Sequence, residues 1–134
     1  DQSLSDIKVM VVDDNQYNRE IACELLRENG AHIIECASGS EAVDYIKYRN
    51  GIVDIILMDV CMPDMDGFEA TRLIRQLEKD RWQDIPIVAM TANAFDEDRK
   101  KALEHGMNGH IAKPIQVDKL LSTLKTILTE NIIL

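Results

Sequence analysis

Acidic, hydroxyl and basic side chains follow the apolar runs of this sequence at the points where those runs stop. The run IILM ends on Asp59, and the residues after it, VCMPDMDG, have the Pro, Asp and Gly content of a turn. IKVMVV ends on Asp13 and Asp14, IPIVAM ends on Thr91, and the short segment HIA is followed by Lys113. Carboxylates, a hydroxyl group and an ammonium group, if they meet, can bind a cation and a phosphoryl group.

The carboxylates suggest which cation. Three crowded carboxylates raise one another's pKa unless a cation neutralises them. Hard oxygen ligands favour Mg²⁺, which takes one or two carboxylates together with phosphate oxygens and keeps several waters. Lys113 would then contact phosphoryl oxygens, Thr91 would donate a hydroxyl group to them, and Asp59 could be the nucleophile that forms an aspartyl phosphate.

These side chains meet only if the apolar runs are neighbouring strands of one sheet. Each run is followed by a helical pattern, and five such alternations in a chain of this length predict a doubly wound parallel sheet with right-handed crossovers. The second strand is the most polar and is expected at an edge, which favours the flavodoxin-like order 2-1-3-4-5 with five helices. Strands are expected at residues 7–12, 32–36, 53–59, 85–90 and 110–112.

Helix starts are signalled by capping residues. Asn15 can cap the first helix, and capping-box patterns at residues 38–41 and 66–69 predict the starts of the second and third. A charged helix is expected over residues 93–105, and a strongly amphipathic one begins near Val117.

Composition limits the classes of protein to consider. The 134 residues are 46% hydrophobic and 29% charged, as in a single soluble domain, and no apolar run reaches the length of a membrane span. A net charge of −9 argues against direct nucleic-acid binding. Three cysteines without C-x-x-C spacing indicate reduced thiols and a cytoplasmic location. We expect a linker remnant at residues 1–6, one domain at 7–130 and an extension at 131–134, excised from a longer protein.

Four motifs carry a family resemblance. VVDDN, ILMDVCMPDMDG, VAMTANA and AKPI, in this order and spacing, resemble a response-regulator receiver domain of two-component signalling. The resemblance implies that Asp59 accepts a phosphoryl group from a phosphohistidine. It also implies that Asp14, Asp59 and the main-chain carbonyl of Cys61 bind Mg²⁺ directly, and that Asp13 helps through a water molecule.

The same resemblance assigns the remaining site residues. Lys113 would contact the phosphoryl oxygens and precede a cis peptide bond to Pro114, and Thr91 would be a switch residue that moves toward the phosphoryl group. The family often has Tyr or Phe on the fifth strand as the partner of that movement, and His110 stands there in this chain. An imidazole differs from those rings in packing and charge.

Three segments are similar to those of receiver domains fused to hybrid sensor histidine kinases: DDNQYNRE, MTANAF and GMNGHIAKPI. This resemblance implies that the chain's partner is a histidine kinase or a histidine phosphotransfer domain. The domain itself would be a phosphoacceptor, able to phosphorylate and dephosphorylate itself, and a monomer or weak homodimer without membrane contact. The parent protein could be a kinase anchored in a membrane.

Other interpretations remain open. The chain could be a stand-alone response regulator that acts by protein docking. A Mg²⁺-dependent aspartyl-phosphate phosphatase would carry Asp-x-Asp after its first strand, whereas Asp13 is followed by Asp14 and Asn15. Taken singly, Asp13 and Asp14 could end a strand and favour a helix N-terminus, and Asp59 could be an ordinary turn residue.

Overall fold

Five parallel strands form one sheet in the order β2-β1-β3-β4-β5, as predicted. The computed structural model describes residues 4–49, 53–77, 84–92 and 96–132. The strands are β1 (Lys8–Val12), β2 (His32–Cys36), β3 (Ile55–Asp59), β4 (Ile87–Thr91) and β5 (Gly109–Ala112). The helices are α1 (Gln16–Glu28), α2 (Gly39–Arg49), α3 (Gly67–Arg75), α5 (Asp96–Glu104) and α6 (Val117–Ile132).

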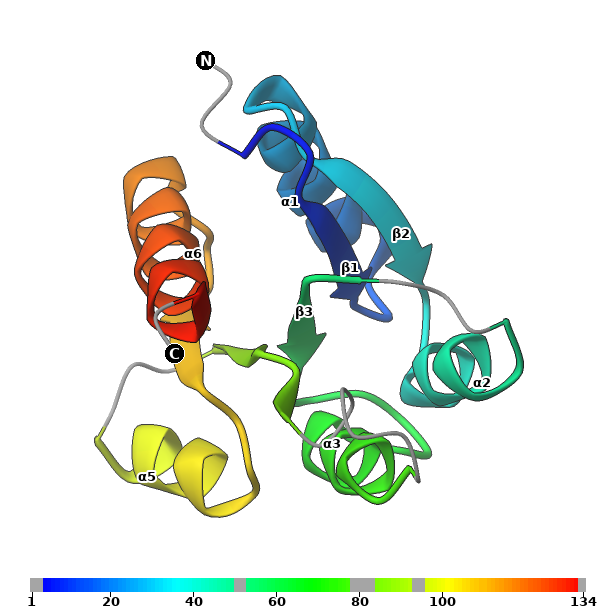
Figure 1. Cartoon of the computed structure of the whole chain (residues 1–134). Helices are drawn as coiled ribbons and strands as arrows, with labels where there is room; N and C mark the ends of the chain where they lie inside the picture. The colour runs from blue at the N-terminus through cyan, green and yellow to red at the C-terminus, as the bar shows by residue number, and fades with distance from the viewer. Residues whose placement is uncertain (1–3, 50–52, 78–83, 93–95, 133–134) are drawn as a thin grey trace.

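Helices cover both faces of the sheet (Figure 1). Alternate side chains of each strand point to opposite faces. In β3, Ile56 and Met58 pack into the core beneath α2 and α3, whereas Ile55 and Leu57 pack into the core beneath α1 and α6. Because both faces are buried, the central strands are continuously apolar rather than alternating.

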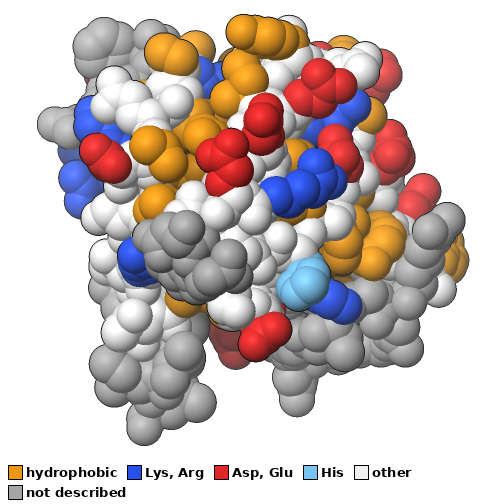
Figure 2. Space-filling model, turned by 90° about the horizontal axis from the view of Figure 1, so that it is seen from above, with side chains coloured by type: hydrophobic (Ala, Val, Ile, Leu, Met, Phe, Trp, Pro, Cys, Tyr) orange, Lys and Arg blue, Asp and Glu red, His pale blue; other side chains and the backbone are white. Residues whose placement is uncertain are grey.

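The most polar strand lies at the sheet edge, where its sequence placed it. β2 pairs only with β1 among the described strands, and it exposes His32 and Glu35. On the face shown in Figure 2, acidic and basic side chains are interspersed with hydrophobic ones.

Four of the five strands have boundaries that differ from those expected. β1 begins at Lys8 rather than at residue 7, and β3 begins at Ile55 rather than at residue 53. β4 begins at Ile87 and includes Thr91, whereas the sequence suggested residues 85–90. Pro86 lacks an N–H group and stands just before the strand, although its carbonyl still accepts a hydrogen bond from Ile56 N at 2.9 Å. β5 includes Gly109 as well as His110.

The capping residues work largely as expected. The side chain of Asn15 accepts from Asn18 N at 3.0 Å, and that of Asp66 accepts from Glu69 N at 2.8 Å. In the box at residues 38–41, Ser38 Oγ accepts from Glu41 N, but the Glu41 carboxylate reaches the amide of Ala37 instead of that of Ser38. The helix starts therefore lie close to those predicted.

The two ends of the described chain add contacts to this frame. Leu4, within the segment expected to be a linker remnant, is buried in the core beside α1, and its amide donates to Asn29 O at 2.8 Å. α6 continues to Ile132, beyond the expected end of the domain. None of the described helices is both long and apolar enough to cross a membrane.

Candidate functional site

The carboxyl ends of four strands bring the expected residues to one edge of the sheet. Asp13 and Asp14 follow β1, Asp59 ends β3, Thr91 ends β4, and Lys113 follows β5. The register of the parallel pairs puts these exits at the same level. Carboxylate oxygens of Asp13, Asp14 and Asp59 lie within 4.8 Å of one another. The three acidic side chains therefore form one pocket, hereafter the acidic pocket.

Asp13 is fixed by contacts on all sides. Its amide donates to Cys36 O at 3.2 Å, and its Oδ1 accepts from Asn15 N at 2.9 Å. Its Oδ2 is buried and 3.0 Å from Lys113 Nζ, within ion-pair distance but without the angle of a hydrogen bond. One buried carboxylate oxygen in the acidic pocket thus keeps capacity for a further ligand.

Asp59 is equally well placed. Its side chain is 4% exposed, and its Oδ1 accepts from Cys61 N at 3.1 Å and lies 3.3 Å from Lys113 Nζ. Lys113 is held in turn by its amide, which donates to Thr91 O at 2.7 Å. The peptide bond from Lys113 to Pro114 is cis, as the family resemblance implied. One ammonium group therefore bridges Asp13 and Asp59.

The electrostatics of the acidic pocket follow from burial and crowding. Burial, and then the charge of Asp13, raise the pKa of Asp59 from 3.8 to about 6, although Lys113 and the amide of Cys61 act in the opposite direction. Burial alone would lower the pKa of Lys113, but the close contacts with the negative charges of Asp13 and Asp59 outweigh it and raise that pKa. At neutral pH Asp59 is mostly a carboxylate and Lys113 is an ammonium.

The donor set fits a hard divalent cation. The three carboxylates of the acidic pocket offer only oxygen ligands, and Asp14 is exposed, so that a cation can enter from solvent. Asp13 Oδ2 has no hydrogen bond that a cation or its water would have to displace. Oxygen ligands with room for water and phosphate are the surroundings that Mg²⁺ prefers.

A close contact between α3 and β3 shapes the other side of the site. A Cβ atom on Gly67 would lie 2.3 Å from Asp59 O and 2.8 Å from Val60 Cα. Only glycine allows the first residue of α3 to approach the main-chain carbonyl of Asp59 so closely. The sequence suggested Gly67 as part of a turn, but this contact depends on the path of the whole loop.

Sequence reasoning also missed a basic residue. Arg19, on α1, donates from Nη1 to Asp13 O at 2.8 Å, and its Nε is 3.2 Å from Glu35 Oε1 on β2. The second strand was expected only to form an edge of the sheet, yet its residue Glu35 is linked to Asp13 through this arginine. The only signal in the sequence was a basic residue one turn into the helix that follows Asp13 and Asp14.

Thr91 and His110 lie on the sheet face that α5 covers. Thr91 is buried at the end of β4. His110 on β5 pairs with Ala89, which lies two residues before Thr91 on β4. Residues two apart on a strand share a face, and Ala89 belongs to the core that includes Ala102 of α5. The half-buried His110 therefore has the placement expected of a partner for Thr91.

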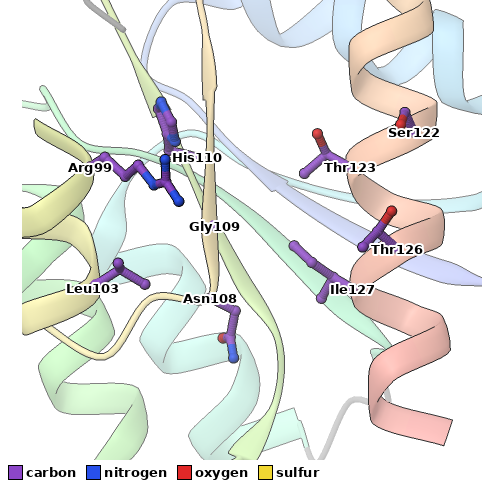
Figure 3. Close-up of a pocket in the computed structure, with 9 residues that line it drawn as sticks. All are labelled: Arg99, Leu103, Asn108, Gly109, His110, Ser122, Thr123, Thr126 and Ile127. Atoms are coloured by element: carbon purple, nitrogen blue, oxygen red, sulfur yellow. The ribbon is translucent and has the colours of Figure 1, made fainter. Parts of the chain in front are cut away.

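His110 also borders a groove outside the acidic pocket. The groove, of about 350 Å³, lies between α5 and α6 with β5 as its floor. In Figure 3, Arg99 extends from α5 toward His110, and the hydroxyl groups of Thr123 and Thr126 lie on the α6 side. His110 thus lines this groove rather than the acidic pocket. β5 connects the two sites, because it carries His110 and is followed by Lys113.

The fold is an open parallel α/β sheet, and three carboxylates and a lysine lie at the carboxyl ends of its strands. These features define a class of proteins whose site suits a cation and a phosphoryl group. The chain belongs to the response regulator receiver domain family, whose model matches residues 9–125. A phosphoacceptor role in a two-component phosphorelay fits this family and this site.

Relatives in the family include sensor kinases. The osmosensing histidine protein kinase SLN1 of Saccharomyces cerevisiae is 42% identical over 97% of this chain and 10% of its own length. The signal transduction histidine-protein kinase BarA of Escherichia coli is 40% identical over 92% of this chain and 13% of its own length. The chain therefore spans a small part of these curated relatives, and its likeness to hybrid-kinase receivers is confirmed.

A solved structure extends the comparison to the site. The receiver domain of sensor histidine kinase PA1611 from Pseudomonas aeruginosa is 34% identical, with a TM-score of 0.81 over 92% of this chain and 98% of that one. That structure holds a magnesium ion coordinated in its active-site cleft. The fold is thereby confirmed.

Proposed function

We propose that the chain is the phosphoacceptor of a phosphorelay and that Asp59 takes a phosphoryl group from a phosphohistidine. The observation that carries this proposal is the position of Lys113 Nζ, 3.3 Å from Asp59 Oδ1 and 3.0 Å from Asp13 Oδ2. A nucleophilic carboxylate beside an ammonium group can attack phosphorus while the ammonium holds the oxygens of the group being transferred.

The transfer balances as a displacement at phosphorus. An oxygen of the Asp59 carboxylate bonds to phosphorus, and the bond from phosphorus to the donor imidazole nitrogen breaks. The electron pair of that bond goes to the imidazole, which takes a proton from solvent. The product is an acyl phosphate on Asp59, whose oxygens Lys113 would contact. The pKa of Asp59, about 6, leaves the carboxylate ionised and nucleophilic at neutral pH.

Asp14, Asp59 and the main-chain carbonyl of Cys61 are the proposed direct ligands of Mg²⁺, with Asp13 acting through a water molecule. The spacing of the three carboxylates supports this assignment. When bound, Mg²⁺ supplies positive charge to the phosphoryl oxygens during transfer. The protein's own part is to hold the ligands in place through Cys36 O, Asn15 N and Lys113.

Thr91 and His110 are the proposed switch residues. The Thr91 side chain would move toward the phosphoryl group and donate its hydroxyl to a phosphoryl oxygen. His110, on the same sheet face, would change its position when Thr91 moves. Such a response is a two-state bias driven by new phosphate contacts.

The proposed donor is a histidine kinase or a histidine phosphotransfer domain, and the proposed parent is a hybrid sensor histidine kinase. The identity to SLN1 and BarA over most of this chain supports both proposals. A cytoplasmic location suits the free thiols of Cys23, Cys36 and Cys61.

The proposal is tested by incubating the chain with Mg²⁺ and acetyl phosphate and measuring its intact mass. We expect one phosphoryl adduct on the native chain and none on Asp59→Asn. Asp64→Asn is the matched control, because Asp64 is exposed five residues further on and asparagine tolerates its positive φ of 66°. An unmodified native chain, or an equal adduct on Asp59→Asn, would contradict the proposal.

A further inference from the structure

Arg19 joins the loop that carries two carboxylates of the acidic pocket to the edge strand of the sheet. Its side chain is 16% exposed and uses two of its nitrogens at once. Nη1 donates to Asp13 O at 2.8 Å, and Nε contacts Glu35 Oε1 at 3.2 Å. The fork of a guanidinium group suits this double contact, because its donors are fixed relative to one another.

The contact to Asp13 O bears directly on Asp14. The carbonyl of Asp13 and the amide of Asp14 belong to one planar peptide unit, so fixing that oxygen fixes the direction in which the chain enters Asp14. The Asp14 side chain is exposed and therefore owes its position mainly to its backbone. Arg19 thus holds the peptide plane from which the most accessible carboxylate of the acidic pocket projects.

Glu35 keeps Arg19 in this position. Its Oε1 contacts Arg19, and its Oε2 lies 3.4 Å from Arg27 Nη2 on the same helix. Arg27 makes no described contact with Asp13, and its side chain is 56% exposed. Two arginines of α1 therefore share one carboxylate, but only Arg19 extends to the acidic pocket.

We propose that Arg19 is a positioning residue for the carboxylates that follow β1, and that Glu35 orients it. This inference rests on the proposed function, because its effect would be seen in the proposed Mg²⁺ site. A positive charge near that site would weaken cation binding if it acted by charge alone. A positioning role has the opposite sign: loss of Arg19 weakens Mg²⁺ binding, because Asp14 loses its fixed approach.

The test is a titration of the full chain with Mg²⁺, in which binding is monitored by the NMR signals of the Asp14 and Asn15 amides. We expect Arg19→Gln to bind Mg²⁺ about tenfold more weakly than the native chain, at the lower end of the cost of losing an outer-shell partner. Arg27→Gln is the matched control, because it removes the same charge from the same helix and the same carboxylate. It should bind within about twofold of the native chain, since charge acts weakly at an exposed position.

Two further measurements separate positioning from general stability. Without Mg²⁺, the amide signals of Asp14 and Asn15 should shift in Arg19→Gln and stay in place in Arg27→Gln. Arg19→Lys should recover part of the affinity, because an ammonium can donate to Asp13 O but lacks the fork that also engages Glu35. If Arg19→Gln does not fold, Glu35→Gln replaces it, with a smaller loss of affinity expected.

Native affinity in Arg19→Gln, or an equal loss in Arg27→Gln, would overturn the inference while leaving the proposed function intact. A native chain that does not respond to Mg²⁺ would instead overturn the proposed metal site itself. The two failures are therefore distinguishable in one series of titrations.

Discussion

Replacing Asp59 with asparagine should stabilise the cation-free protein at neutral pH. Burial and the charge of Asp13 raise the pKa of Asp59 to about 6, against 3.8 for the free group. An acid whose folded pKa exceeds its unfolded pKa binds more protons in the folded state at intermediate pH. Its ionisation therefore destabilises the fold. The cost is absent below about pH 4, grows as the pH rises toward about 6, and is complete above that value.

The size of this effect can be bounded from the structure. Each pKa unit corresponds to about 1.4 kcal/mol, so the rise to about 6 sets an upper bound of roughly 3 kcal/mol. Exposed Asp14 leaves the acidic pocket open to water and salt, which screen the charge, and Lys113 loses one of its two carboxylates. Asparagine keeps an oxygen that can accept from Cys61 N. We expect a gain of about 1 kcal/mol at pH 8.

Urea unfolding of native, Asp59→Asn and Asp64→Asn chains, in EDTA at pH 4, 6 and 8, measures this difference. The gain should be largest at pH 8 and absent at pH 4 for Asp59→Asn, with no gain for the exposed Asp64→Asn. A gain that does not change with pH, or a loss at pH 8, would refute the assignment of the cost to a buried, crowded carboxylate. Added Mg²⁺ should reverse the order, because it binds and stabilises the native chain.

Two further substitutions test the surroundings of Asp59. Lys113→Gln leaves Asp13 and Asp59 without their shared counter-ion, so urea unfolding should show a loss of about 2 kcal/mol, and acetyl phosphate should form the adduct more slowly. Gly67→Ala puts a Cβ atom 2.3 Å from Asp59 O. The free energy of unfolding should fall by about 1–3 kcal/mol, seen as a lower melting temperature, and adduct formation should slow. Gly39→Ala, whose nearest contact would be 3.1 Å, should leave adduct formation unchanged; an equal slowing there would contradict the role given to Gly67.

The strand order could be predicted because each step depended on local sequence. Continuous apolar runs predicted buried strands, and the more polar sequence of residues 32–36 predicted that this strand lies at an edge, as β2 does. The meeting of Asp13, Asp59 and Lys113 followed from that order, because parallel strands deliver their exits to one edge. The chemical roles of these residues remain predictions that the experiments above address.

The contacts of Arg19 with Asp13 O and with Glu35 could not be predicted from the sequence. Glu35 looked like a surface residue of an edge strand, and Arg19 looked like one of several charges on α1. Their link to Asp13 requires knowing that α1 packs across β2 with Arg19 on the inner side. The strain that Gly67 avoids is equally invisible in sequence, because its φ is not one that demands glycine and the constraint comes from the space beside Asp59.

If Asp59 is phosphorylated as proposed, the charge count of the site predicts an effect beyond it. Counted by formal charge, three aspartates and one lysine give the site a net charge of about −2, which one divalent cation balances. Converting the carboxylate of Asp59 into an acyl phosphate adds about one further negative charge. Lys113, which already contacts Asp13 and Asp59, would then have an additional set of anionic oxygens to neutralise. Because Lys113 follows β5 directly, a shift in its contacts would act on the strand that places His110 in the groove between α5 and α6.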